Sequence, residues 1–293
     1  MNNKSVTTGI CCLPYENTYG RYGEDKFRKI KQHGYDAVDY NISDTDCELY
    51  SLDETALEEK MKKEAERARE AGIVISQVHG PWRYPPQDAT EDDRAERLEK
   101  MQKCARMTAL LGCKYLVIHP IMPYGTHDLE LGRAKETRAL NEQFFRALVD
   151  YAKQYGVTVC MENMPMLQFS LATPKQVLEF VQNFDDENLK ICLDTGHVAV
   201  FPGESAGDAV RELGEYIKVL HIHDNKGDRD AHLHPTEGIV DWADFFRALD
   251  EINFDGVLSL ETFPSADLDD ERFEEEGLRL NRLLKQLIAE KDN

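Results

Sequence analysis

Side chains that bind metals recur at the carboxyl ends of successive short apolar runs in this sequence. These positions carry histidines, glutamates and aspartates: His79, His119, Glu162, Asp194, His221, His223, Asp224 and Glu261, with His197 shortly after Asp194. Carboxylates and imidazoles in this combination suit Mn²⁺, Mg²⁺, Co²⁺ or Zn²⁺ and do not suggest a thiolate site. The residue types therefore predict a site for a divalent cation.

Each of these residues has a simpler interpretation when it is taken alone. A single histidine at the end of a strand is usually a hydrogen-bonded structural residue, and Asp194 could cap the turn that follows it. Several successive runs that end in such residues are difficult to explain in this way, because a buried, unpaired charge costs several kcal/mol. A shared cation would remove that cost by supplying the opposite charge.

The apolar runs that carry these residues are short and mostly β-branched, and they alternate with charged, amphipathic segments. They cover residues 7–14, 36–42, 73–80, 115–120, 157–164, 189–197, 218–225 and 257–262. Nearly continuous apolar runs of this length are typical of parallel strands that are buried on both faces. We therefore expect eight parallel strands.

The segments between the runs carry the signals of helix ends. Ser51 and Glu54 have the spacing of a capping box, and Gly72 follows as a C-terminal stop. Candidate N-caps of later helices are Thr173, which precedes a proline, Ser205 and Asp241. Further helices are expected over residues 91–111, 133–155 and 269–288, the first two closed by Gly112 and Gly156.

This alternation predicts one (β/α)8 TIM barrel that occupies residues 1–293. A doubly wound open sheet alternates in the same way, but the length fits the ~250 residues of a barrel with modest insertions. No glycine-rich nucleotide-binding motif follows the first run, and the candidate insertions are residues 82–88 and 226–239. The carboxyl ends of barrel strands converge on one mouth, where the predicted ligands would meet.

The composition limits the partners and the compartment. Acidic residues number 55 against 35 basic ones, a formal charge of -20, and no basic run is present, so we expect a small-molecule partner and no nucleic acid. The same charge is also explained by solubility alone. Seven cysteines without a CxxC pair, and an N-terminus without an apolar core, predict free thiols, a cytoplasmic protein and no membrane partner. The oligomeric state stays open, a homo-oligomer included.

Six motifs around these residues resemble the xylose-isomerase-like TIM barrel superfamily. They are HGP (79–81), VIHP (117–120), MENMP (161–165), LDTGH (193–197), HIHDN (221–225) and LSLET (258–262). Residues 229–242, RDAHLHPTEGIVDW, resemble a stretch common in the sugar-isomerase-like branch, with a Thr where that pattern usually has Gly. The superfamily contains sugar-phosphate isomerases and epimerases, inosose-type dehydratases and endonuclease IV enzymes, and the likeness covers nearly the whole chain.

The likeness to the ketose epimerases implies one divalent ion held by Glu162, Asp194, His223 and Glu261. Glu162 and Glu261 would act as acid and base, moving a proton next to the carbonyl of a sugar, sugar phosphate or polyol ketone through an enediolate. The preference for His223 over His221 comes from the resemblance, because alternation along a strand points both residues to the same side.

Other residues are assigned to substrate binding. By the resemblance His197 and Arg229 would contact substrate, although Arg229 between two aspartates could also form a surface ion pair. We also place His79 and His119 in this set. Trp82, Tyr84 and Phe263 are candidate walls for a sugar face, with ordinary loop packing as the alternative.

The likeness to endonuclease IV leaves a second interpretation open. Those enzymes bind three zinc ions, and the corresponding residues here are His79, His119, Glu162, Asp194, His197, His223, Asp230, His232 and Glu261. The charge of -20 and the loop WRYPPQD (82–88) argue against a DNA substrate. We therefore expect a carbohydrate isomerase or epimerase, with an inosose-type dehydratase or an abasic-site DNA hydrolase as alternatives, and with one ion or three.

Overall fold

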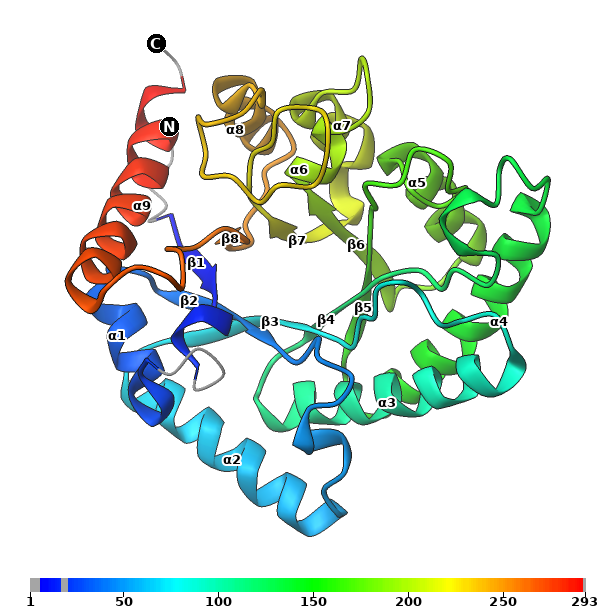
Figure 1. Ribbon diagram of the computed structural model, residues 1–293, viewed down its shortest axis with the longest axis horizontal. Coiled ribbons are helices and arrows are strands. Elements are labelled where there is room, and N and C mark those ends of the chain that lie inside the picture. The colour runs from blue at the N-terminus through cyan, green and yellow to red at the C-terminus, as the bar shows by residue number, and fades with distance from the viewer. Residues whose placement is uncertain (1–5, 17–20, 292–293) are drawn as a thin grey trace.

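The structure is a computed structural model that describes residues 6–16 and 21–291. It contains eight parallel strands surrounded by helices (Figure 1). The strands are β1 (Thr8–Cys11), β2 (Ala37–Asn41), β3 (Val74–His79), β4 (Tyr115–Ile118), β5 (Thr158–Glu162), β6 (Leu189–Asp194), β7 (Ile217–His221) and β8 (Leu258–Leu260). Their order in the sheet is β7-β6-β5-β4-β3-β2-β1-β8, and a parallel bridge between Ile222 and Leu260 joins the two end strands. The predicted TIM barrel is therefore confirmed.

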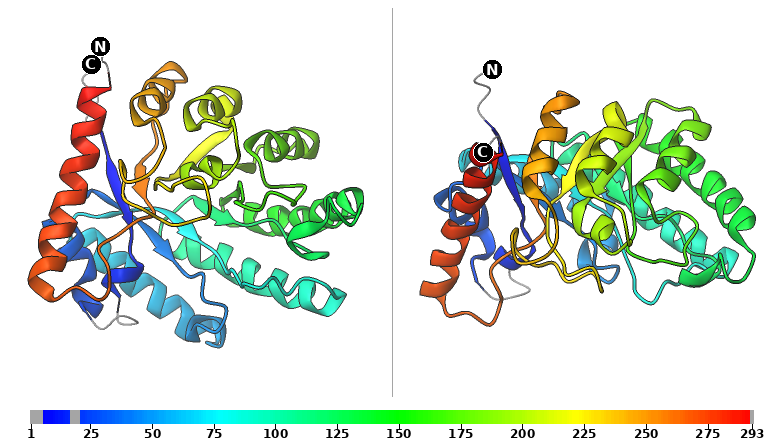
Figure 2. Two further views of the ribbon diagram at one scale, coloured as in Figure 1. Left: turned by 45° about the horizontal axis from the view of Figure 1, so that its top comes forward. Right: turned by 90° about the horizontal axis from the view of Figure 1, so that it is seen from above.

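The helices lie on the outside of the sheet, as the two views of Figure 2 show. They are α1 (Lys26–Gln32), α2 (Glu54–Glu70), α3 (Glu91–Leu110), α4 (Ala134–Lys153), α5 (Pro174–Phe184), α6 (Thr195–Ala199), α7 (Ala206–Leu213), α8 (Trp242–Glu251) and α9 (Asp270–Glu290). Short 3₁₀ helices cover Leu13–Tyr15, Gly23–Asp25, Glu48–Tyr50, Gly125–His127 and Gly214–Tyr216. No helix within the described ranges has the length and apolar character needed to cross a membrane.

Most of the predicted helix ends are confirmed, and one is wrong. Thr173, Ser205 and Asp241 accept hydrogen bonds from the first turns of α5, α7 and α8. The cap of α2 is Asp53, whose side chain accepts from the backbone N–H of Ala56, and not Ser51. Ser51 instead follows the 3₁₀ turn Glu48–Tyr50 and donates its backbone N–H to that turn, so the helix begins later.

All eight strands end before the apolar runs do, and two of these ends change where predicted site residues lie. The run 189–197 leaves the sheet after Asp194, because the Asp194 side chain accepts from the backbone N–H of His197 (2.6 Å) and begins α6. The run 218–225 leaves the sheet after His221. His197 and His223 therefore lie in the segments that follow the strands. His119 and Glu261 likewise come directly after β4 and β8 and not at their last residues.

The buried apolar side chains form two clusters that the sheet separates. Outside the strands, one large apolar cluster packs the sheet against the helices. Inside the barrel, Val117, Cys160, Cys192 and Val219 form a small separate layer. All seven cysteines are free, as predicted. Because this inner layer is thin, polar side chains occupy the rest of the barrel interior, toward the carboxyl ends of the strands.

Candidate metal and substrate site

A cavity of about 840 Å³ opens at the carboxyl ends of the strands, as a TIM barrel leads us to expect. Most of the predicted site residues line it: His79, Trp82, His119, Glu162, His197, Arg229, Asp230, His232 and Glu261, together with Tyr84. Phe263 is not among the described residues that line this cavity. The site thus gathers side chains from strands that lie far apart in the sequence.

Four potential ligands meet next to this cavity. Glu162 and Glu261 line it, whereas Asp194, His221 and His223 are not among the described residues that do. Single ligand atoms of Glu162, Asp194, His221 and Glu261 all lie within 4.8 Å of one another. Nδ1 of His221 is 2.9 Å from Glu162 Oε1 and 3.4 Å from Glu261 Oε2. Glu162, Asp194 and His221 are the last residues of β5, β6 and β7, and Glu261 directly follows β8, so consecutive strands build the group.

This group contains His221 at the position that the resemblance assigns to His223. His221 is the last residue of β7 and is completely buried in the barrel. His223 lies beyond the strand, where its Nε2 is 2.9 Å from Asp194 Oδ2 and its ring stacks on that of His232 at 4.2 Å. Both histidines belong to groups that could hold a cation: His221 with Glu162, Asp194 and Glu261, and His223 with Asp194 and His197 or with His232 and Glu261.

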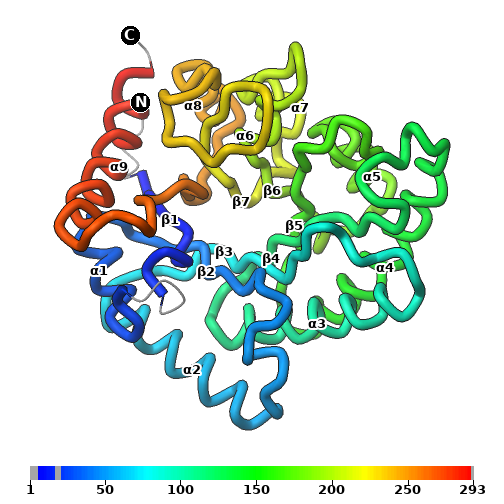
Figure 3. The backbone as a smooth tube through the Cα atoms, viewed as in Figure 1, coloured from blue at the N-terminus to red at the C-terminus, as the bar shows by residue number. Residues whose placement is uncertain are grey.

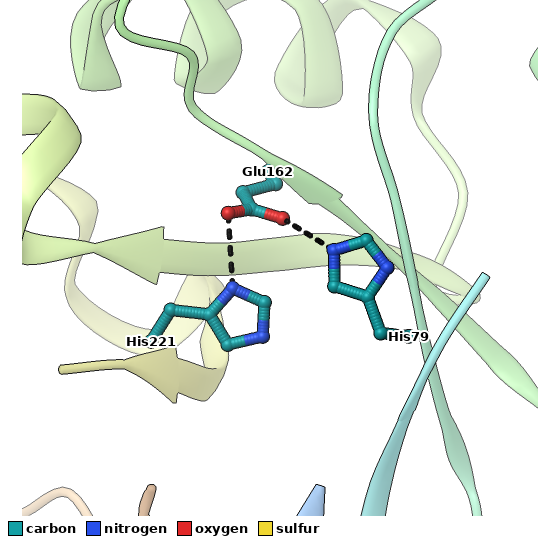
Figure 4. A group of neighbouring side chains, drawn as sticks. All are labelled: His79, Glu162 and His221. Atoms are coloured by element: carbon teal, nitrogen blue, oxygen red, sulfur yellow. Dashed lines mark hydrogen bonds and ion pairs between the residues drawn. The ribbon is translucent and has the colours of Figure 1, made fainter. Parts of the chain in front are cut away.

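Two more histidines approach Glu162 from the side of β3 and β4. Nε2 of His119 is 3.0 Å and Nε2 of His79 is 3.6 Å from Glu162 Oε2. Figure 4 shows the Glu162 carboxylate between His79 and His221, whose rings are nearly parallel. The edge of the His119 ring packs against Trp82, with ring centroids 4.3 Å apart. Glu162 could thus bridge two neighbouring cation positions.

Asp230 lies within reach of two further histidines. Asp230 Oδ2 is 3.2 Å from Nε2 of His197 and 3.2 Å from Nε2 of His232. His197 Nδ1 donates to the backbone oxygen of Asn163 (2.7 Å), which fixes the orientation of the ring. The described residues near these histidines that lie close enough together to share a further cation are Asp194, His197 and His223, and also His223, His232 and Glu261.

The hydrogen bonding of the site fits a divalent cation. Buried oxygens of two carboxylates, Asp230 Oδ1 and Glu261 Oε2, accept no hydrogen bond from any residue that the structure describes, and Glu162 Oε2 has only the contact with His119 at 3.0 Å and the longer one with His79. Buried carboxylate oxygens are normally satisfied, and leaving them without a partner costs free energy. A cation bound by these oxygens and the neighbouring imidazoles would supply the missing interaction.

The two glutamates that face the cavity have opposite electrostatic environments. Burial disfavours ionisation of Glu162, but the neighbouring His221 and His119 outweigh it and hold the pKa of Glu162 well below its usual range. Burial raises the pKa of Glu261 well above that of an ordinary glutamate, although His221 and His232 oppose this effect. Before a cation binds, the site therefore favours one ionised and one protonated carboxyl group.

Two residues that support the site are not among those predicted from the sequence. Asp39 is buried inside the barrel, and its Oδ2 is 3.1 Å from His221 Nε2. The side-chain amide of Gln77 donates to the same oxygen (3.3 Å). Both residues interrupt otherwise apolar strands, β2 and β3, and that interruption is the signal that could have identified them.

Asp224 was grouped with the predicted ligands, but it has a different position. Its carboxylate is completely buried and accepts from the backbone N–H groups of Thr236 and Val240 and from Trp242 Nε1. These bonds fold the segment between β7 and α8, gold in Figure 3, back onto itself. Asp224 therefore holds the loop that carries Arg229, Asp230 and His232.

Arg229 is exposed at the rim of the cavity. It forms no ion pair with any residue in the described parts of the chain, so the alternative of a surface ion pair is not seen. Asp228 and Asp230, its neighbours in sequence, line the same cavity. The guanidinium group is thus available to a molecule that enters the cavity.

Comparisons with known proteins agree with this architecture. An uncharacterised protein of Methanocaldococcus jannaschii is 29% identical over 238 residues, covering 80% of this chain and 76% of that protein. The D-psicose 3-epimerase of Enterocloster bolteae is 24% identical over 237 residues, covering 80% and 75%. The solved structure of a D-tagatose 3-epimerase-like protein shares the fold with a TM-score of 0.75 at 22% identity, covering 98% and 100%. Residues 27–283 match the xylose isomerase-like TIM barrel family, and the chain belongs to that family.

Proposed function

We propose that this protein is a divalent-metal-dependent carbohydrate isomerase or epimerase that moves a proton next to a carbonyl group. The observation that carries the proposal is the position of two carboxylates around one imidazole. Nδ1 of His221 lies 2.9 Å from Glu162 Oε1 and 3.4 Å from Glu261 Oε2, and both glutamates line the cavity. The similarity to a D-psicose 3-epimerase supports the same chemistry.

The two glutamates perform the proton transfer in this proposal. One carboxylate removes the proton from the carbon beside the carbonyl, and the other returns a proton to the resulting enediolate. A divalent cation held by Glu162, Asp194, His221 and Glu261 would stabilise the negative charge that develops on the substrate oxygens. His197 and Arg229 line the same cavity and would orient the substrate hydroxyl or phosphate groups.

Exchange with solvent tests the proposal directly. The Mn²⁺-loaded protein is incubated in deuterated water with D-psicose, D-tagatose, D-fructose and an inosose, and deuterium at the carbon beside the carbonyl is measured by NMR. We expect incorporation with at least one of them, and a loss of about 10²–10⁴-fold in the Glu162→Gln and Glu261→Gln variants. Glu136→Gln, a change on the surface of α4, is the matched control. Full exchange in either active-site variant would contradict the assigned roles.

The additional histidine groups favour one second candidate, an abasic-site DNA hydrolase with three zinc ions. Its support is that His79 and His119 approach Glu162, while His197 and His232 approach Asp230. Elemental analysis of the purified protein separates the candidates by counting metal atoms per chain. Nicking of abasic duplex DNA, with binding that weakens steeply as salt increases, would favour the hydrolase. Loss of water from an inosose would indicate a dehydratase.

A further inference from the structure

The cavity is larger than the proton-transfer group at its floor requires. Its volume of about 840 Å³ lies within the range of roughly 300–1,000 Å³ that proteins use for drug-sized ligands. A free monosaccharide in contact with Glu162 and Glu261 would occupy only the inner part of this space. The outer part therefore has room for a second chemical group on the same substrate.

One side of the outer cavity is lined by aromatic rings. The ring of His119, which contacts Glu162, packs on Trp82, and the Trp82 ring lies 6.4 Å from that of Tyr84. Tyr84 is 70% exposed although it lines the cavity. The side chains of His119, Trp82 and Tyr84 therefore lie one after another between Glu162 and the exposed loop after β3.

The loop after β5 extends this apolar surface. Met164, Pro165, Met166 and Leu167 all line the cavity, and Leu167 is 52% exposed. The strands β3 and β5 flank β4 in the sheet, so the two loops stand on the same side of the mouth. Exposed apolar side chains that gather in one cavity usually mark a binding surface.

Leu167 is exposed on a loop that is held in place. Asp128, which is completely buried, accepts from the backbone N–H of Ser170 (2.8 Å). The backbone N–H of Met164 donates to Ala172 O (2.8 Å), and that of Phe169 donates to Met166 O (3.1 Å). The exposure of Leu167 is therefore built into the loop, and a ligand would meet an apolar surface that is already formed.

Polar side chains line the cavity on the loop after β7, where Arg229, Asp228 and Asp230 stand. Asn41 at the end of β2 and Ser43, next to Trp82, add polar groups near the aromatic rings. A ligand that matches this distribution has hydroxyl groups at one end and an apolar group at the other. A free sugar provides only the first of these features.

We propose that the substrate is a keto-glycoside, a glycoside whose sugar ring carries a ketone and whose anomeric oxygen carries an aryl or alkyl aglycone. Its sugar ring reacts at Glu162 and Glu261, and its aglycone packs against Trp82, Tyr84, Met166 and Leu167. This inference rests on the proposed carbohydrate function. It names the substrate class of the same site.

Matched pairs of ligands test this inference without requiring turnover. Dissociation constants of methyl and phenyl glycosides of glucose, galactose and mannose, in both anomeric forms, are measured by calorimetry on the Mn²⁺-loaded protein. We expect the phenyl member of at least one pair to bind about tenfold more tightly or better, because one face of the ring leaves water. Leu167→Asp and Tyr84→Ala should abolish this preference.

Leu131→Asp is the control, because Leu131 is 61% exposed on the loop after β4 and is not among the described residues that line the cavity. This variant should keep the preference of the wild-type protein. If no pair shows a preference, or if the preference survives in both Leu167→Asp and Tyr84→Ala, the inference is wrong. Failure of the proposed function has a different signature, which is the absence of deuterium exchange while phenyl glycosides still bind more tightly.

Discussion

Nε2 of His221 lies 3.1 Å from Oδ2 of Asp39, while Nδ1 of the same ring lies 2.9 Å from Glu162 Oε1. One ring nitrogen of His221 thus contacts a candidate ligand, and the other contacts a carboxylate that is buried inside the barrel. A histidine that binds a metal commonly donates its second N–H to such a carboxylate, which fixes the tautomer and strengthens the ligand. Asp39 is therefore suited to position His221.

Replacement of Asp39 by Asn tests this relationship. Without the carboxylate, His221 loses the partner that selects its tautomer, and we expect the affinity for Mn²⁺ to fall by about 10–100-fold. Calorimetric titration with Mn²⁺ measures the change. Asp36→Asn is the control, since Asp36 precedes the same strand but pairs with Lys31 on the surface. Equal Mn²⁺ affinity in Asp39→Asn and the wild-type protein would rule out the positioning role.

The two histidines near the end of β7 should differ in their effect on the metal. His221 belongs to the four-residue group with Glu162, whereas His223 contacts Asp194 from outside the strand. Loss of a residue that only orients a metal ligand weakens metal binding by ~10–100-fold. We expect His221→Ala to weaken Mn²⁺ binding by more than this. His223→Ala should cause a smaller loss. The reverse order in the same titration would restore His223 as the central ligand.

The fold and the carboxylates of the site could be predicted because their signals are local. Each apolar run gives a strand, and Glu162, Asp194 and Glu261 interrupt or follow these runs at the same end. The choice between His221 and His223 depends on where β7 leaves the sheet. That position is set by contacts with β6 and β8, which the local pattern does not contain.

Asp39 could not be identified as a site residue because its partner is distant in the sequence. A single aspartate in the middle of an apolar run is ambiguous, and its partner, His221, is 182 positions away in sequence. Asp224 presents the opposite difficulty. It follows a strand as a ligand would, but its carboxylate points toward the loop that it organises, and only the position of Trp242 shows this.

Substitution of Asp224 should therefore affect stability and the shape of the loop. The carboxylate accepts from Thr236 N, Val240 N and Trp242 Nε1, so Asp224→Ala leaves several buried donors without an acceptor. We expect a decrease of about 3 kcal/mol or more in the free energy of unfolding, measured with urea at pH 7. Asp228→Ala, on the exposed part of the same loop, should change stability by less than about 0.5 kcal/mol. A similar small change in Asp224→Ala would contradict the anchoring role.

The contact between α9 and the start of the chain should make stability depend on pH. Glu274 accepts from His33 Nε2, Lys29 Nζ and Tyr22 Oη. Partial burial alone would raise its pKa, but these hydrogen bonds prevail and lower the pKa of Glu274 to about 2. The unfolded chain has an ordinary glutamate with a pKa near 4.5. Ionised Glu274 therefore stabilises the fold fully above pH ~4.5, and this contribution is lost as the pH falls toward ~2.

Glu274→Gln separates this contribution from the rest of acid unfolding. At pH 6 we expect the variant to be less stable than the wild-type protein by about 1–2 kcal/mol, because hydrogen bonds to a charged acceptor are lost. The difference should shrink as the pH decreases from about 4.5 toward 2, since the wild-type carboxylate then takes up a proton. Urea unfolding followed by circular dichroism at several pH values measures both quantities, with Glu271→Gln on the exposed first turn of α9 as the control. A difference that stays constant across this pH range would show that Glu274 stabilises the protein by packing and not by its charge.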